Sequence, residues 1–205
     1  MATVTASAKT SRSADEGLIP YKLTVRQFDK MIVAGVLPED ANVELLGGLL
    51  VEQMTKYPPH DFCVEHLSDA LESLRLDDVR VREEKSVELG DAWCPEPDLS
   101  VVRGPGDRYR NTRPRSKDIF LLIEVSESTY STDRTQKWQG YAAAKIPFYW
   151  IVNLSKRVVE VYSNPPGRGK TAKYRDSATF GPGDSIPVII ENAEVGKISV
   201  DDFLP

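Results

Sequence analysis

The sequence predicts one domain of the α/β or α+β class, in which helices pack on a mixed β-sheet. Short apolar runs of strand length recur along the chain, separated by loops rich in proline, glycine and arginine. Stretches with helical spacing of apolar residues lie between these runs. The 205 residues, 40% hydrophobic and 28% charged, fit one globular domain of ordinary composition. We expect this domain over residues 20–205, after a disordered tail over 1–19.

The first part of this domain is expected to hold a helix and a hairpin. Thr24 is a natural N-cap, and the helix that follows is expected to end at Gly35. Its apolar positions at helical intervals are Phe28, Ile32 and Val33. Two consecutive glycines then predict the turn of a hairpin within 43–54.

The remaining helices and strands are predicted from the same two patterns, helical spacing of apolar residues and apolar runs of strand length. A second helix is expected over 58–76, with an apolar stripe made of Phe62, Leu67, Leu71 and Leu74. A third helix is expected over 131–145. Strands are expected at 79–89, 97–102, 118–125, 147–154, 157–163 and 185–190, before a closing turn at 200–205.

Two acids stand out in this pattern. Asp98 follows a proline at the head of a β-branched run, and Glu124 lies within the apolar run "FLLIEV". Because a strand alternates its faces, we expect Phe120 and Leu122 on the side of Glu124. We expect Leu121, Ile123 and Val125 on the other side.

A buried ionised carboxylate is costly unless a cation or hydrogen-bond donors meet it. Two carboxylates near the ends of neighbouring strands are hard oxygen ligands of the kind that Mg²⁺ accepts. The alternative is structural: Asp98 caps a turn, and Glu124 pairs with an arginine.

The third expected helix contributes a lysine. Asp133, Lys137 and Tyr141 recur at four-residue intervals and therefore share a face, with Gly140 and Ala144 beside them. If this face packs on the sheet, Lys137 would point its ammonium group toward the acids. The alternative is an ordinary Asp-Lys pair on a solvated face.

Several of these stretches together resemble a known family. They are "PD" at 97–98, the acid of "LLIEVSEST", the run "D...K...YAAAKIPFYWIVNL" at 133–154 and "VELLGGLLVEQM". In combination they resemble the Uma-type restriction endonuclease family of the PD-(D/E)XK nuclease superfamily, from about Leu23 onward. The resemblance implies a restriction-endonuclease-like core, in which helices flank a central mixed sheet. It also implies hydrolysis of DNA phosphodiester bonds with Mg²⁺ or Mn²⁺, and a homodimer.

The resemblance also implies roles for individual residues. Asp98 and Glu124 would be catalytic metal ligands, and the carbonyl of Val125 would be a third ligand. Glu44 would be a catalytic residue near the same site, and His60 would support the ligands or contact the substrate.

One position departs from the superfamily pattern, which places a lysine two residues after the glutamate. This chain has Ser126 there, and the resemblance implies that Lys137, on the following helix, takes the place of that lysine. Lys137 would orient the attacking water, help to deprotonate it or stabilise the transition state. Asp133 and Tyr141, on the same helix face, would support this site or contact the substrate.

DNA would have to be bound locally, because a net charge of -5 argues against broad, nonspecific coating of nucleic acid. The loop 103–118 concentrates arginines between the two acidic strands and could contact phosphates beside the site. The arginines expected to bind DNA are Arg108, Arg110, Arg113 and Arg115. The alternative is a solvated connector.

Other functions have less support. Two cysteines do not form a disulfide framework, and the sequence has neither a long apolar run nor a secretory signal, so we expect a cytoplasmic protein without a membrane partner. A zinc site would use His60, Cys63, His66 and Cys94. Helical spacing would spread the first three around the helix axis, and no CxxC pair supports them. A Cys-His hydrolase has still less support. The remaining alternative is a catalytically weak or inactive nuclease fold that acts as a nucleic-acid-binding or scaffold module.

Overall fold

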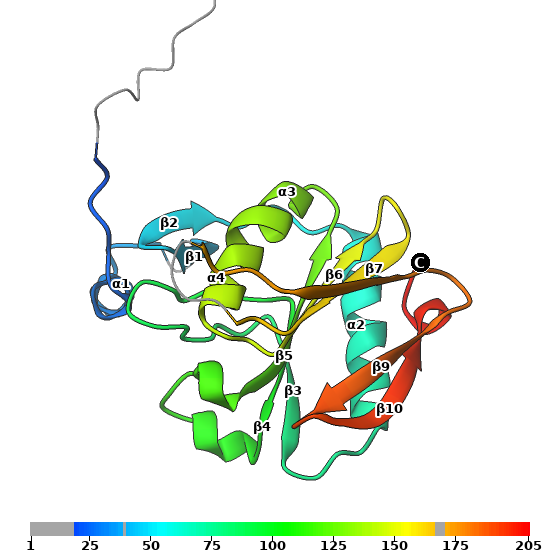
Figure 1. Cartoon of the computed structure of the whole chain (residues 1–205). Coiled ribbons are helices and arrows are strands. Elements are labelled where there is room, and N and C mark those ends of the chain that lie inside the picture. The colour runs from blue at the N-terminus through cyan, green and yellow to red at the C-terminus, as the bar shows by residue number, and fades with distance from the viewer. Residues whose placement is uncertain (1–18, 39, 167–170) are drawn as a thin grey trace, which may run out of the picture.

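The computed structural model describes residues 19–38, 40–166 and 171–205 (Figure 1). The expected disordered tail lies outside these ranges except for Ile19, and the single-domain assignment stays a prediction. Within the described ranges, no helix has the length and apolar character needed to cross a membrane.

A six-stranded mixed sheet forms the centre of the protein, with the strand order β3-β4-β5-β6-β7-β8. Neighbouring strands are antiparallel except for β5 and β6, which are parallel. Parallel neighbours need a crossover connection, and a helical segment between β5 and β6 provides it. The strands are β3 (Val79–Glu83), β4 (Leu99–Arg103), β5 (Ile119–Ser126), β6 (Phe148–Asn153), β7 (Val158–Ser163) and β8 (Asp176–Phe180).

Helices and two hairpins surround this sheet. The helical crossover consists of α3 (Tyr130–Thr132), a π-helical turn (Asp133–Lys137) and α4 (Trp138–Ala143). The other elements are α1 (Val25–Val33), β1 (Val43–Leu46), β2 (Leu49–Glu52), α2 (Pro58–Ser73), β9 (Ser185–Ile190) and β10 (Ala193–Ser199). Short 3-10 turns span Gly106–Tyr109, Ser116–Asp118 and Val200–Asp202.

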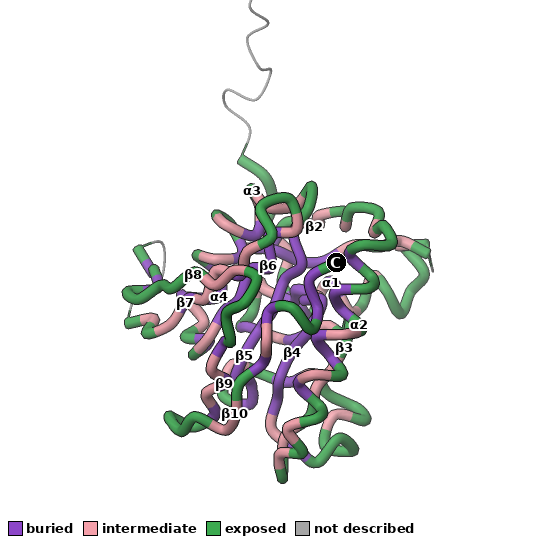
Figure 2. Tube along the Cα trace, turned by 90° about the vertical axis from the view of Figure 1, so that its right-hand side faces the viewer, coloured by how far each residue is buried: buried purple, intermediate pink, exposed green. Residues whose placement is uncertain are grey.

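The elements form layers on both faces of the sheet. Figure 1 shows α2 and the β9–β10 hairpin on one side and α4 on the other. Leu67 of α2 packs in one core cluster with Leu121 and Ile123 of β5, whereas Tyr141 of α4 packs in a second cluster with Leu122. Figure 2 shows that the central strands are buried over most of their length. The α/β class is therefore confirmed.

A smaller unit holds α1 against the β1–β2 hairpin. Val25 and Phe28 of α1 form a third core cluster with Leu45 and Cys94. Cys94 also exchanges two backbone hydrogen bonds with Leu45, which pins the chain before β4 to β1.

Two expected helix faces are wrong in part. In α1, Phe28 is buried, but Ile32 and Val33 are 47% and 88% exposed because only the first turns of the helix meet the hairpin. In α2, Phe62 is 40% exposed and stacks on His66, so it lies outside the buried stripe. The buried apolar residues of α2 are Cys63, Val64, Leu67 and Leu71.

The expected alternation along β5 is also wrong at one residue. The pairing of β4 with β5 shifts between Val101 and Val102, which face Leu121 and Ile119. The residue between these partners, Phe120, consequently joins the core cluster of the α2 face rather than that of Leu122. A bulge of this kind reverses the side on which the preceding residue lies.

Other expected boundaries change for local reasons. The strand expected over 79–89 ends at Glu83, because Glu84 has a positive φ of 47° that leaves the extended conformation. β8 and β10 were not expected, since β8 consists largely of polar, exposed residues and neither strand contains an apolar run. The helix expected over 131–145 is present, but a π-helical turn interrupts it.

Candidate active site

Antiparallel pairing brings the two predicted strand acids together. Asp98 precedes β4 and Glu124 lies near the end of β5, so the two acids sit at the same end of the paired strands. The backbone N–H of Val125 donates a 2.7 Å hydrogen bond to Oδ2 of Asp98. Asp98 is therefore fixed against the residue that follows Glu124.

The crossover helix delivers Lys137 to these acids. Its Nζ lies 3.1 Å from Oε2 of Glu124 and 3.2 Å from Oε1 of Glu44, which comes from β1. Oδ1 of Asp133 lies 3.9 Å away. The side chain of Lys137 is only 8% exposed, so the shared face of Asp133, Lys137 and Tyr141 packs on the sheet rather than in solvent.

Hydrogen bonds explain how Glu124 is tolerated inside an apolar strand. Tyr141 donates a 2.7 Å hydrogen bond to Oε1, while Lys137 meets Oε2. Tyr141 is held in turn by an edge-to-face contact with Tyr149, whose hydroxyl donates to the backbone carbonyl of Asp133. Both oxygens of this buried carboxylate thus have partners, as the cost of burial requires.

The π-helical turn places Asp133 over the end of β5. Ser126 and Thr129 donate hydrogen bonds of 2.7 and 2.6 Å to Oδ2 of Asp133. Single π turns within helices are frequent at functional sites. Ser126 therefore binds the helix that carries Lys137.

Carboxylates outnumber cations around Lys137, and the pKa values reflect this. Burial raises the pKa of Glu124 well above its ordinary value, and the charges of Asp133, Asp98 and Glu44 raise it further against the effect of Lys137. Burial raises the pKa of Asp133 as well. Burial alone would lower the pKa of Lys137, but Glu124 and Glu44 raise it above its ordinary value, so this group is an ammonium ion.

Asp98 belongs to a second group of charges, which the sequence did not predict in full. Its Oδ1 lies 3.1 Å from Nε2 of His60, at the start of α2, and 3.3 Å from Nζ of Lys56. Burial would raise the pKa of Asp98, but the His60 hydrogen bond and the Lys56 charge lower it below its ordinary value. Lys56 also pairs with Glu84 at 2.8 Å. The only sequence signal for Lys56 is its place shortly before His60 in "TKYPPHDF".

These residues line one cleft of about 240 Å³. Its walls include both charge groups, namely Glu44, Lys56, His60, Asp98, Glu124, Val125, Asp133 and Lys137. Within the described part of the chain, no group of three or more His, Cys, Asp or Glu side chains is arranged to hold a metal ion.

The zinc and cysteine alternatives receive no support from this arrangement. His60 bonds to Asp98, and His66 bonds to the backbone carbonyl of Phe62 at the surface. Cys63 and Cys94 are free, buried and in different core clusters. Burial raises the pKa of Cys63 to about 12 and that of Cys94 to about 11, so neither is a reactive thiolate.

Three of the four predicted DNA-binding arginines contact acids of the protein. They are Arg108, which pairs with Asp118 at 2.9 Å, Arg113 with Asp29 at 2.8 Å, and Arg115 with Glu88 at 3.0 Å. Arg110 is exposed and, among the described residues, has no acidic partner. The first three are therefore paired within the protein, and the binding of DNA by any of the four stays a prediction.

Trp93 fixes the distance between the hairpin and the helix that carry Glu44 and Lys137. A Cβ built on Gly47 would lie 3.7 Å from the Trp93 ring, and a Cβ built on Gly140 would overlap that ring. Gly47 follows Glu44 by three residues, and Gly140 follows Lys137 by three. The Trp93 indole thus lies between the β1–β2 hairpin, which carries Glu44, and the crossover helix, which carries Lys137.

Gly140→Ala is therefore expected to separate these elements. Overpacking of this kind costs about 1–3 kcal/mol in the free energy of unfolding, which urea denaturation would measure. Gly181→Ala is the matched control, because an added Cβ there would meet only Val158, at 4.0 Å. Equal stability of both variants would show that the Trp93 ring moves away from the added methyl group without a loss in the free energy of unfolding.

Comparisons with known proteins agree with this architecture. Residues 25–195 match the family described as "Uma2: Putative restriction endonuclease". A solved structure described as a "putative nuclease belonging to DUF820" from Anabaena variabilis is 17% identical, with a TM-score of 0.66 over 89% of this chain and 97% of that one. No curated protein matches the chain.

A second solved structure is the type IIG restriction endonuclease BpuSI, 20% identical over 52% of this chain and 11% of that one. Its TM-score of 0.34 is too low to support an argument about fold. The match to the Anabaena protein supports a restriction-endonuclease-like fold, and the family match covers most of the sequence. The chain belongs to the Uma2 family of restriction endonuclease-like proteins.

Proposed function

We propose that this protein is a metal-dependent endonuclease that hydrolyses DNA phosphodiester bonds. The observation that carries this proposal is the buried ammonium group of Lys137, which lies between Glu44 and Glu124 at the wall of a cleft that also contains Asp98. A restriction-endonuclease-like site needs an ammonium group near acidic metal ligands, and family membership supports the same reading.

The donor set fits Mg²⁺ or Mn²⁺. Mg²⁺ is usually held by one or two carboxylates and several waters, so a complete cage of protein ligands is not needed. Asp98 and Glu124 would hold the ion, with the carbonyl of Val125 as a further ligand lining the same cleft. The excess of carboxylates that raises the pKa of Glu124 is the charge that a divalent cation would neutralise. A bound ion would supply a water of lowered pKa and stabilise negative charge on the phosphate.

The side chains of the protein have separate tasks in this proposal. Lys137 orients the attacking water and stabilises the negative charge that develops on the phosphate. Glu44 holds Lys137 in place and accepts a 3.1 Å hydrogen bond from the N–H of Glu96. His60 orients Asp98 through its 3.1 Å contact, which keeps the other oxygen of Asp98 directed at the end of β5.

The test is cleavage of plasmid and linear DNA by the purified protein with Mg²⁺ or Mn²⁺. We expect cleavage with either ion and none with EDTA. Asp98→Asn keeps the size of the side chain and removes its charge, and it is expected to lower the rate at least about 100-fold, since a metal-bound group supplies several kcal/mol of stabilisation.

Two results would contradict this proposal. Cleavage that continues at the parent rate in Asp98→Asn would exclude Asp98 as a ligand. Binding of DNA without cleavage under every metal condition would favour the alternative, a nuclease fold that acts as a nucleic-acid-binding or scaffold module.

A further inference from the structure

We propose that a groove beside β3 binds the sugar-phosphate backbone of the DNA strand that enters the cleft. This inference rests on the proposed function and names the surface that positions its substrate. The β3 groove has a volume of about 600 Å³. Its lining residues are Arg82, Glu83, Glu84, Lys85, Gly106, Tyr109 and Arg110.

The acids of this groove are engaged within the protein. Glu83 accepts a hydrogen bond from the hydroxyl of Ser68 on α2. Glu84 pairs with Lys56 at 2.8 Å. The charge of Glu84 is therefore offset by a cation outside the groove, and the carboxylate of Glu83 is held by a hydrogen bond to α2.

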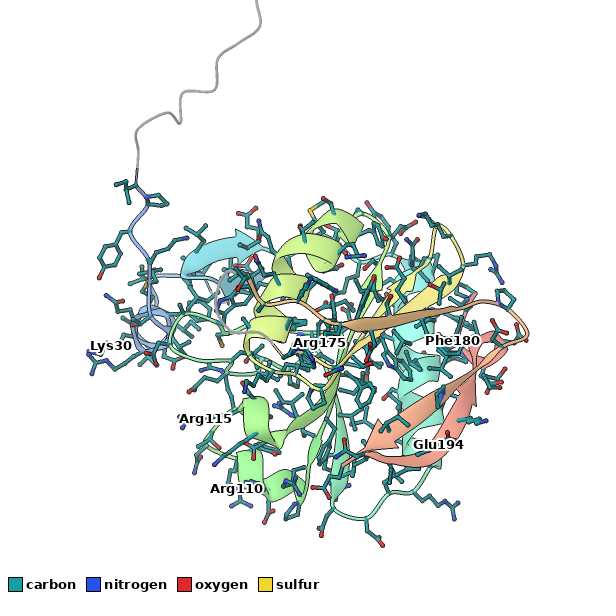
Figure 3. All side chains as sticks on the ribbon, in the orientation of Figure 1. Lys30, Arg110, Arg115, Arg175, Phe180 and Glu194 are labelled. Carbon is teal, nitrogen blue, oxygen red and sulfur yellow. The ribbon has the colours of Figure 1, made fainter. Side chains whose placement is uncertain are left out.

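The cations of the groove are not engaged in this way. Over the described ranges, none of Arg82, Lys85 and Arg110 lies within ion-pair distance of an acid. Arg82 stacks over the ring of Tyr109 at 5.6 Å, which fixes its guanidinium at the groove wall. Lys85 and Arg110 are exposed, and Figure 3 shows Arg110 on the surface of the loop between β4 and β5. A groove with three such cations suits a chain of phosphates.

The groove and the cleft share a wall. The backbone N–H of Glu84 donates a 2.9 Å hydrogen bond to the carbonyl of Asp98, and Lys56 lies between the two carboxylates. A strand that lies along the groove would thus pass Lys56 and reach the acids of the cleft. Lys56 is 25% exposed, so its ammonium group is accessible at this junction.

This geometry gives an acidic protein a local way to bind a polyanion. The net charge of -5 opposes binding elsewhere on the surface. The groove cations contact phosphates and not bases, so they position the strand without reading its sequence.

The test compares two double variants in binding to a fluorescent DNA duplex, with EDTA present to prevent cleavage. Lys85→Ala with Arg110→Ala removes the two exposed groove cations. Lys30→Ala with Arg175→Ala removes the same charge from two other exposed positions, one in α1 and one just before β8. Both residues are labelled in Figure 3. All four residues are at the surface, and circular dichroism would check that each variant is folded.

We expect the groove variant to bind about 10-fold more weakly and the slope of log affinity against log salt to fall by about 2, one unit for each lost phosphate contact. The control is expected to change the affinity less than about 2-fold. If both variants lost affinity for DNA equally, or if the parent protein did not bind DNA, the proposed role of the groove would be overturned. DNA binding that needs the groove without any cleavage would instead reject only the proposed function.

Discussion

Lys137→Met is expected to lower DNA cleavage about 10³-fold, because it removes the positive charge that stabilises the transition state. The same variant is expected to lose about 3–5 kcal/mol in the free energy of unfolding, since it leaves buried carboxylates without a cation. Glu44 and Glu124 each lie within 3.2 Å of its Nζ and are almost fully buried. Methionine keeps most of the side-chain volume, so the loss would report charge rather than packing.

Urea denaturation and initial rates of plasmid cleavage would measure both effects. Lys197→Met is the matched control, because Lys197 pairs with Glu194 at 3.8 Å on an exposed hairpin. Exposed pairs contribute at most about 1 kcal/mol, so this control is expected to keep both stability and activity. Full cleavage by Lys137→Met would remove Lys137 from the mechanism.

Glu124→Gln is expected to lower cleavage about 10³-fold without loss of stability, because several kcal/mol of metal-assisted stabilisation correspond to roughly that factor in rate. The amide keeps the size of the side chain and its capacity to accept the hydrogen bond from Tyr141. It removes a charge that burial and the neighbouring acids oppose. Lys137 retains Glu44 as a partner.

The sign of the pH dependence follows from the raised pKa of Glu124. The folded state binds this proton more tightly than the unfolded state, so the stabilisation is complete below the unfolded pKa of about 4.3 and is lost as pH rises toward the folded pKa. Glu124→Gln removes this dependence and is expected to exceed the parent in stability at pH 8, by about 1.4 kcal/mol for each unit of pKa shift that it removes.

Urea denaturation of parent and variant at pH 5 and pH 8, without added metal, would measure this difference. A loss of stability in Glu124→Gln as large as that in Lys137→Met would contradict the prediction that this variant keeps its stability. The carboxylate would then be half of a structural ion pair, and the case for a functional site would weaken.

Local periodicity was sufficient to predict the elements that carry the site. The four-residue spacing of Asp133, Lys137 and Tyr141 predicted one helix face, and these three residues are buried together against the sheet. The apolar run around Glu124 predicted a buried strand, and all residues of β5 are buried. The cost of burying an acid then required a cation or donors nearby.

Charge partners depended on contacts between distant segments. Nothing near Arg113 in the sequence indicates Asp29, and nothing near Asp98 indicates that His60 and Lys56 would share one of its oxygens. Three arginines of the basic loop consequently form ion pairs within the protein, which its composition did not predict.

The sequence by itself determined the strand with its acid and the helix with its lysine, because hydrophobic periodicity is a local property of the chain. Only the tertiary structure decided that Glu44 would be the second partner of Lys137 and that Trp93 would lie against Gly140. It also decided that Ser126 would bind Asp133. These contacts depend on strand order, on the crossover and on the π-helical turn, which determine the distant side chains that meet in the cleft.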